Sequence, residues 1–374
     1  IVSDNCSNDG SAEFLESINS KKVKILHTKT FLSMAEHWDF IQSYASGDWQ
    51  IFVGIDDGLQ KYFFQLADKL TKLAERKHIK VIMSERAYYF LPGCEKIYGD
   101  IKIQYKSLNK IKVKKSKREF KRSLFKINHT YFVLPEMYTT SLFHKDIIDK
   151  SRSLQNGKLF ITHPQDANLA ALSCILEKKY LYSCIPLSWV GSSSISAVYV
   201  TTMGTKDNIS EELVSFKENY IKYQKSIETS NLTIAENVGY NLLFSNHTCL
   251  WNSGILVNSV ANNNSFKFLN KKITAYKIII TILKEHNINT ITNFDSVAIV
   301  DLIKRNNINI NVLLFLYFLN NSFSFFLKLL NYPYLNFVEA KLFSEYSYKT
   351  SDIISMNDVN ELIYEKNNKQ LKDL

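Results

Sequence analysis

Residues 47–59 read GDWQIFVGIDDGL, a short apolar segment that ends in two adjacent carboxylates. The segment at residues 51–53 has the character of a buried strand, Gly54 interrupts it, and Asp56 and Asp57 follow at its carboxyl end. In open α/β sheets, ligands bind in the crevice outside the carboxyl ends of the strands. Two acids there suit a divalent cation and the phosphates that accompany it. The alternative is an ordinary strand that ends in an Asp-Gly turn and binds nothing.

Short apolar strands and amphipathic helices alternate on both sides of this block. Ahead of it, a strand is expected at residues 23–27, and Ser33 with Glu36 forms the capping-box pattern that begins a helix. After it, residues 60–76 carry one apolar helical face and residues 80–84 read as a strand. This alternation predicts an α/β fold with a mostly parallel sheet and helices on both faces.

The middle of the chain has a different pattern. Residues 100–113 alternate apolar and polar side chains, as in a hairpin or a pair of edge strands. Residues 131–134 are strand-like, and residues 140–150 favour a helix. Asp166 then opens a strong helix that is predicted to reach Lys178.

The last part of the chain lacks strand–helix alternation. We expect residues 1–205 to form one α/β unit, and residues 206–374 to form a helical region of unknown role. Its most apolar segment, residues 312–330, is interrupted by Asn, Ser and Lys. A membrane-spanning helix needs about 20 mostly apolar residues, so this segment is predicted to be a core or interfacial helix.

The formal charge of +10 is concentrated in one segment. Residues 102–126 contain eleven Lys and Arg and one acid, Glu119, so the rest of the chain is neutral. Such a run is usually a solvated face. It could also contact the phosphates of a bound ligand, or anionic lipid headgroups at a membrane surface. Binding of nucleic acid is less expected, because the run lacks regularly spaced aromatic residues.

The five cysteines are scattered and form no Cys-x-x-Cys pair. Neither a disulfide framework nor a zinc site follows from that, and a reducing cytoplasm is the expected compartment. No secretory signal is visible in the given sequence. The chain opens on Ile1 in what reads as the middle of a strand, so we expect a further N-terminal piece to precede it.

Two stretches precede the block at residues 47–59: SDNCSNDGS at residues 3–11 and LSMAEHWDF at residues 32–40. In this order and spacing, the three resemble the family 2 glycosyltransferases of the GT-A fold. The resemblance covers about residues 1–200. It departs from the family in two respects: the first strand is absent, and the Asp-x-Asp block reads Gly54-Ile55-Asp56, with a glycine in place of the leading acid.

The resemblance implies roles for five acids. Asp56 would hold Mn²⁺ or Mg²⁺ against the diphosphate of a nucleotide sugar, with Asp57 beside it. Asp4 and Asp9 would contact the nucleotide, and Asp166 would be the catalytic base. Without the resemblance, turns and helix caps explain Asp4, Asp9 and Asp166.

We therefore expect a metal-dependent, inverting glycosyltransferase, cytoplasmic or peripheral on the inner face of the membrane. It would transfer a sugar from a nucleotide-diphosphate donor to a hydroxyl of a cell-envelope or surface glycan or a lipid-linked acceptor. One alternative is a sugar-phosphate nucleotidyltransferase or another nucleotide-binding α/β enzyme, which would need a Gly-rich phosphate loop. The other is a non-enzymatic nucleic-acid-binding protein that uses residues 102–126.

Overall fold

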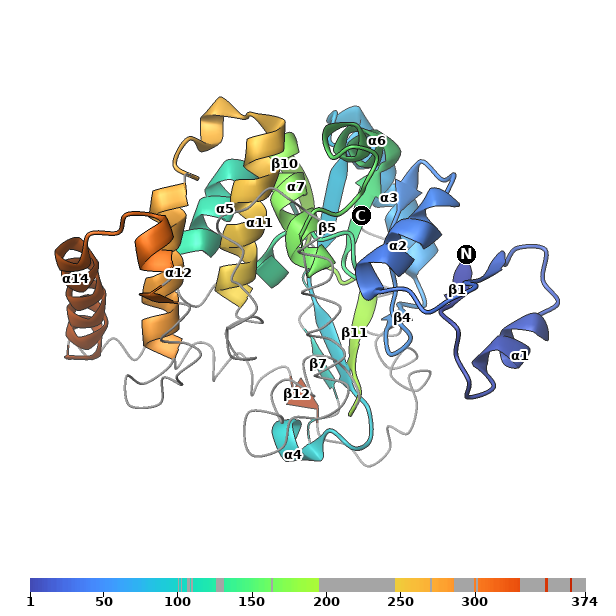
Figure 1. Cartoon of the computed structure of the whole chain (residues 1–374). Helices are drawn as coiled ribbons and strands as arrows, with labels where there is room; N and C mark the ends of the chain where they lie inside the picture. Colours follow the sequence, from blue (N-terminus) through green and yellow to red (C-terminus); the bar gives the residue numbers. More distant parts are fainter. Residues whose placement is uncertain are drawn as a thin grey trace.

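Helices surround two mixed β-sheets in the computed structural model of the chain (Figure 1). The α/β class is therefore confirmed. The structure describes residues 1–99, 101, 103–105, 108, 110–125, 131–162, 164–194, 246–269, 271–285, 299–300, 302–329, 347–348 and 364.

The first sheet carries the start of the acidic block and has the strand order β3-β9-β5-β10-β8. Its strands are β3 (Trp49–Gln50), β9 (Ser141–His144), β5 (Val81–Ser84), β10 (Lys179–Ser183) and β8 (Ile111–Lys115). β5 and β10 are parallel, whereas β9 is antiparallel to both β3 and β5, and β8 is antiparallel to β10. Strands β3, β5 and β10 therefore run in one direction and β8 and β9 in the other.

The expectation of a mostly parallel sheet is wrong, because β9 occupies a place that the sequence pattern assigned to a helix. Leu142 packs into the core beneath helix α3 (Phe63–Arg76), and Phe143 packs into the core on the opposite face of the sheet. A four-residue strand buried on both faces shows no period that would reveal it. The helix in this region, α6 (Lys145–Leu154), begins only after β9 and is capped by His144.

The second sheet has the strand order β12-β7-β6-β11-β4. Its strands are β12 (Ser347–Tyr348), β7 (Ile103–Tyr105), β6 (Ala87–Phe90), β11 (Ser188–Ser192) and β4 (Gly58–Leu59). β6 and β11 are parallel, and the other pairs are antiparallel. Because β7 and β8 belong to different sheets, the predicted hairpin is wrong, although β8 is an edge strand as the alternative expected.

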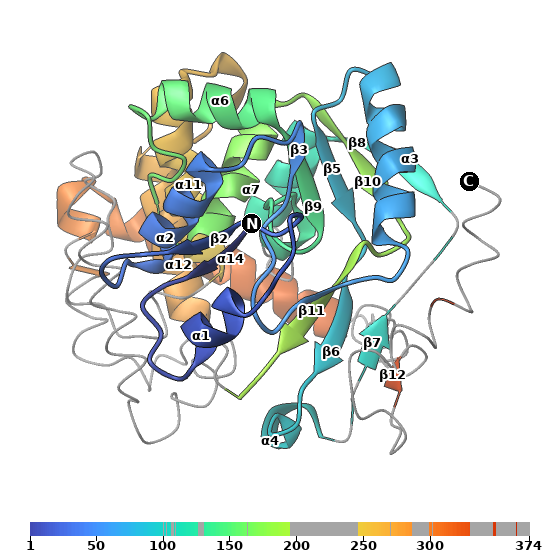
Figure 2. The same ribbon diagram turned by 90° about the vertical axis from the view of Figure 1, so that its right-hand side faces the viewer.

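The two sheets are joined where β5 continues into β6 and β10 continues into β11 (Figure 2). The chain also passes from β3 in the first sheet to β4 in the second through residues 51–57. Three connections therefore cross the same junction between the sheets. The acid pair Asp56 and Asp57 lies in one of them.

Helices cover both faces of the first sheet, as predicted. Along β5, Ile82 packs under α3 (Phe63–Arg76), whereas Val81 and Met83 join the core on the other face. That second core is closed by α5 (Ser116–Phe125) and α7 (Gln165–Leu176). Alternate residues of strand β5 thus pack into two different hydrophobic cores, one on each face of the sheet.

A separate two-stranded parallel sheet lies at one side of the molecule, at the right of Figure 1. It consists of β1 (Val2–Asp4) and β2 (Ile25–His27), which are connected through α1 (Ser11–Glu16). The next helix, α2 (Met34–Ser43), begins with the predicted capping box. The Ser33 hydroxyl accepts from the Glu36 N–H, and the Glu36 carboxylate accepts from the Ser33 N–H at 3.0 Å.

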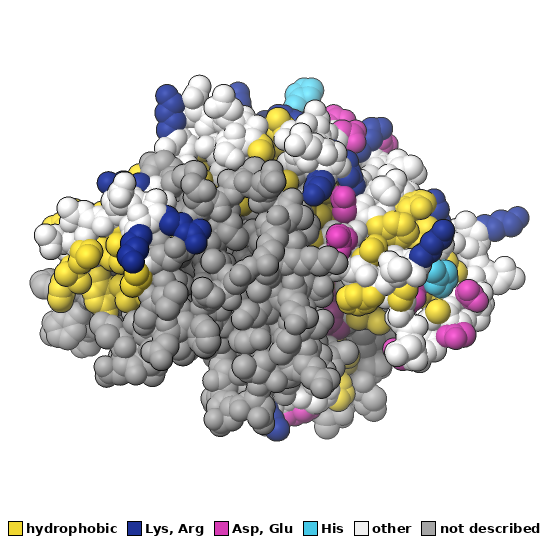
Figure 3. Space-filling view, in the orientation of Figure 1, with side chains coloured by type: hydrophobic (Ala, Val, Ile, Leu, Met, Phe, Trp, Pro, Cys, Tyr) yellow, Lys and Arg dark blue, Asp and Glu magenta, His cyan; other side chains and the backbone are white. Residues whose placement is uncertain are grey.

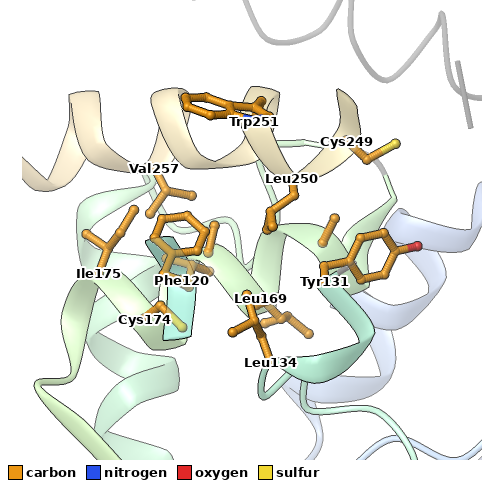
Figure 4. Close-up of a cluster of buried hydrophobic side chains, with 14 of the residues drawn as sticks. Phe120, Tyr131, Leu134, Leu169, Cys174, Ile175, Cys249, Leu250, Trp251 and Val257 are labelled. Carbon is orange, nitrogen blue, oxygen red and sulfur yellow. The ribbon is translucent and has the colours of Figure 1, made fainter. Parts of the chain in front are cut away.

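The described C-terminal helices share the larger hydrophobic core. Helix α11 (Asn246–Ala261) lies along α7, and Leu250 and Val257 point into the layer between them (Figure 4). The Trp251 indole donates to the Leu124 carbonyl at 3.1 Å, which ties α11 to α5. The predicted boundary at residue 205 lies outside the described residues.

Two further helices follow, α12 (Lys271–Glu285) and α14 (Ile310–Leu329). The described part of the chain contains no helix with both the length and the apolar character that crossing a membrane requires. Short elements complete the fold: α4 (Glu95–Tyr98), η1 (Tyr131–Val133) and η2 (Asn264–Phe266). η1 is a 3₁₀ turn, so the strand predicted at residues 131–134 is wrong.

Candidate functional site

The carboxylate of Asp57 holds together three segments at the sheet junction. Its Oδ2 accepts hydrogen bonds from the Gly54 N–H at 2.8 Å and the Thr139 hydroxyl at 3.0 Å. Its Oδ1 accepts from the Gly191 N–H at 2.9 Å. Both oxygens of Asp57 are therefore engaged in closing the turn between β3 and β4 and in binding it to β11.

Asp56 is the other acid of the pair, and it makes fewer contacts than Asp57. Its carboxylate is half-buried, and Oδ2 lies 3.4 Å from the Ser193 hydroxyl. Burial raises the pKa of Asp56, and the negative charge of Asp57 raises it further. A cation at this carboxylate would relieve both effects, because it favours the ionised form.

Two glycines make this turn possible. A side-chain carbon on Gly54 would lie 2.5 Å from the Tyr138 hydroxyl and 2.9 Å from Asp57 Oδ2. One on Gly191 would overlap the backbone carbonyl of Asp56. A side chain at position 54, where the Asp-x-Asp pattern has its leading aspartate, would therefore require the Tyr138 and Asp57 side chains to shift.

A buried ion pair involves the connection between β5 and β6. Arg86, in the bend between β5 and β6, binds Glu136 through Nη2 and donates from Nε to the Phe132 carbonyl at 3.0 Å. Glu136 is fully buried, and its Oε2 has no hydrogen-bond partner among the described residues. Burial raises the pKa of Glu136, and the Arg86 guanidinium opposes that rise.

Arg86 and Glu136 are not among the site residues that the sequence pattern indicated. The available signal was weak: a single glutamate within the apolar stretch LPEMY at residues 134–138, and a single arginine between strands β5 and β6. Buried charges are paired in folded proteins, so each one calls for a partner. The two lie 50 positions apart in the sequence, and periodicity cannot connect them.

Asp166 lies in the first turn of α7, close to this ion pair. The helix cap is Pro164, which makes no side-chain capping bond, so the alternative role of Asp166 as the N-cap is wrong. Its Oδ1 accepts from the Ala167 N–H at 3.0 Å. Burial raises the pKa of Asp166 to about 6, while Arg86 and the Tyr131 hydroxyl oppose the rise.

Glu136 links the two groups of acids electrostatically. The charges of both Asp166 and Asp57 raise its pKa. The Glu136 carboxyl therefore lies within electrostatic range of both Asp57 and Asp166.

Asp4 and Asp9 lie elsewhere, in and after β1. Asp4 is buried and accepts from the Ser7 N–H at 3.2 Å, and hydrogen bonding by Ser7 lowers its pKa. Asp9 is exposed and accepts from the Ser11 N–H at 3.1 Å, which closes a turn. No contact within the described residues joins either acid to the junction. His163, three residues before Asp166, lies outside the described residues.

The basic run divides into two described elements, β8 and α5. On β8, Lys112 and Lys115 are exposed, whereas Lys114 is half-buried and its ammonium lies 3.3 Å from the Tyr182 ring centre. On α5, Lys117, Arg118, Lys121 and Arg122 are exposed. Apart from Lys114, these cations of the basic run face solvent, on helix α5 and on the edge strand β8.

The donor set fits a cation that is shared with a ligand. Within the described residues, no group of three or more His, Cys, Asp or Glu side chains could enclose a metal ion. Mg²⁺ in nucleotide-dependent enzymes is commonly held by one or two carboxylates together with substrate phosphates. Asp56 provides such a carboxylate, and the hydrogen bonds to Asp57 hold the turn that presents it.

No known protein family matches this chain, and no curated protein is significantly similar to it.

Proposed function

We propose that this protein is a metal-dependent, inverting glycosyltransferase of GT-A type that uses a nucleotide-diphosphate sugar. The observation that supports this best is the division of labour among three carboxylates at one sheet junction. Asp57 fixes the turn, Asp56 is presented for a cation, and Asp166 has a pKa raised to about 6. A cation site beside a basic carboxylate is the arrangement that this reaction requires.

On the donor side, Asp56 would hold Mn²⁺ or Mg²⁺. A bound cation neutralises the negative charge that develops on the departing nucleoside diphosphate. The hydrogen bonds from Gly54, Thr139 and Gly191 to Asp57 keep the turn rigid, so Asp56 would need little rearrangement to bind.

On the acceptor side, Asp166 would act as the general base. Its carboxylate would take the proton from an acceptor hydroxyl as that oxygen bonds to the anomeric carbon and the bond from that carbon to the phosphate oxygen breaks. A single displacement of this kind inverts the anomeric configuration. A carboxylate with a pKa of about 6 is ionised at neutral pH, and it is more basic than an ordinary aspartate.

Arg86 and Glu136 would position Asp166. The Arg86 charge favours the ionised form of Asp166, and Arg86 is fixed by Glu136 and by the Phe132 carbonyl. The acceptor would be a cell-envelope or surface glycan or a lipid-linked precursor. All five cysteines are free thiols, which suits the reducing cytoplasm where we place the reaction.

The test is release of nucleoside diphosphate from a panel of nucleotide sugars in the presence of Mn²⁺. Asp166→Asn should lower turnover at least about 100-fold while donor binding persists, because general bases contribute about 10²–10⁴. Asp149→Asn makes the same change at an exposed aspartate on α6 and should leave turnover unchanged. Retained turnover in Asp166→Asn would contradict the proposal. Release of pyrophosphate from a nucleoside triphosphate incubated with a sugar 1-phosphate would instead indicate a nucleotidyltransferase.

A further inference from the structure

Helix α14 presents a broad apolar face to solvent. Of the side chains that are described along it, Leu313 is buried and Leu316 and Tyr317 are half-buried, and these fix the inner side of the helix. Over residues 310–319 the outer side is mostly apolar, with one exposed polar residue, Asn311. Its exposed apolar side chains are Ile310, Val312, Leu314, Phe315, Phe318 and Leu319, and the two phenylalanines are each 63% exposed.

The N-terminal end of α14 is anchored, so this face is held outward. The Asn309 side chain caps the helix by accepting from the Asn311 N–H at 2.9 Å and the Val312 N–H at 3.2 Å. The Asn309 N–H donates to the Tyr276 hydroxyl of α12 at 3.0 Å. Leu313 is part of the main core. The apolar residues thus belong to an ordered helix packed on the rest of the fold.

The end of the molecule that carries α14 is cationic. Within residues 246–329, the described side chains include five Lys and Arg and no acid. The basic helix α5 is part of the same end: Lys277 of α12 lies 5.1 Å from the Phe125 ring centre, and Lys121 lies 4.9 Å from that of Phe268. Figure 3 shows the apolar patch at the left beside Lys and Arg side chains, whereas the acidic side chains gather on the other side of the view.

We propose that α14 binds an anionic lipid surface, with its apolar face inserted at the level of the headgroups and the neighbouring cations in contact with lipid phosphates. An interfacial helix of this kind combines a Phe- and Leu-rich face with nearby Lys and Arg. Charge selects this occupant over a second copy of the chain, because a two-fold contact would bring two cationic ends together. The proposal does not depend on the transferase activity.

The test is co-flotation of the full chain with vesicles of phosphatidylcholine alone or mixed with phosphatidylglycerol at 3:1. The double variant Phe315→Glu/Phe318→Glu should reduce binding to the anionic vesicles at least tenfold. The matched control is Phe14→Glu/Phe64→Glu, which changes two exposed phenylalanines and the net charge identically on α1 and α3. That control should bind as the natural chain does. Both pairs are exposed, so circular dichroism should show folded protein.

A second measurement reports on position 315 itself. The fluorescence of Phe315→Trp should shift to shorter wavelength on addition of anionic vesicles, whereas that of Phe64→Trp should change much less. Absence of vesicle binding by the natural chain would overturn the proposal. Equal binding of both double variants would overturn it as well, as would a variant at 315 and 318 that alters only the oligomeric state.

Discussion

The Asp57 carboxylate accepts a 2.9 Å hydrogen bond from the backbone N–H of Gly191, a residue 134 positions away in the sequence. This bond joins the turn after β3 to strand β11. The two adjacent acids, Asp56 and Asp57, thereby differ in their contacts, because Asp57 is engaged on both oxygens whereas Asp56 accepts from the Ser193 hydroxyl.

The two acids should therefore differ in their contribution to stability. Asp57→Ala removes the acceptor of three hydrogen bonds and should lower the free energy of unfolding by about 2–4 kcal/mol. Asp56→Ala should change it by no more than about 1 kcal/mol. Urea denaturation of the two variants measures both values. Equal losses would show that the carboxylates are not functionally divided.

Gly54 should be sensitive to the addition of a single methyl group. Gly54→Ala places that carbon 2.5 Å from the Tyr138 hydroxyl and should cost about 1–3 kcal/mol. Tyr138→Phe removes the hydroxyl, so Gly54→Ala should cost less in that background. A double-mutant cycle in thermal or urea unfolding provides the coupling energy. Strict additivity would mean that Tyr138 is not what excludes a side chain at position 54.

The buried ion pair should be costly to break from one side. Arg86→Met leaves Glu136 buried without its partner and should lower the free energy of unfolding by about 3–5 kcal/mol. Arg86→Met/Glu136→Gln removes both charges and should recover part of that loss. Chemical denaturation of the single and double variants is the measurement. A double variant as unstable as the single one would show that the unpaired charge is not the cause.

Asp166 should make stability depend on pH. Its pKa is about 6 in the folded protein against an ordinary value of 3.8, so folding favours the protonated carboxyl. That stabilisation is complete below about pH 3.8 and is lost as pH rises through about 6, a change on the order of 3 kcal/mol. Asp166→Asn should therefore lose less stability than the natural chain between pH 4 and pH 8. Parallel profiles would contradict the raised pKa.

The local features of the fold were predictable, and the tertiary ones were not. The Ser33 capping box, the helix after Asp166 and the strand at β5 follow from nearest-neighbour patterns, which the sequence displays directly. Strand β9 was missed because tertiary burial on both faces defines it. The joining of α11 to α7 across a long sequence separation carries no periodic signal either.

In the candidate site, too, the local features were predictable from the sequence and the tertiary contacts were not. The turn chemistry of residues 54–58 indicated Asp56 and Asp57, and the order of motifs indicated Asp166. That Asp57 is structural, however, depends on Thr139 and Gly191, which are distant in the sequence. Arg86 and Glu136 are recognisable as functional candidates only once their burial and pairing are known.

Metal-dependent binding of a nucleoside diphosphate tests the central claim most directly. Thermal unfolding is measured with uridine, guanosine and thymidine diphosphates, with Mn²⁺ and then with chelator, for the natural chain, Asp56→Asn and the control Asp149→Asn. The account predicts that one nucleotide raises the melting temperature only with Mn²⁺, that Asp149→Asn retains the shift and that Asp56→Asn loses it. A full Mn²⁺-dependent shift in Asp56→Asn, or none in the natural chain, would contradict it.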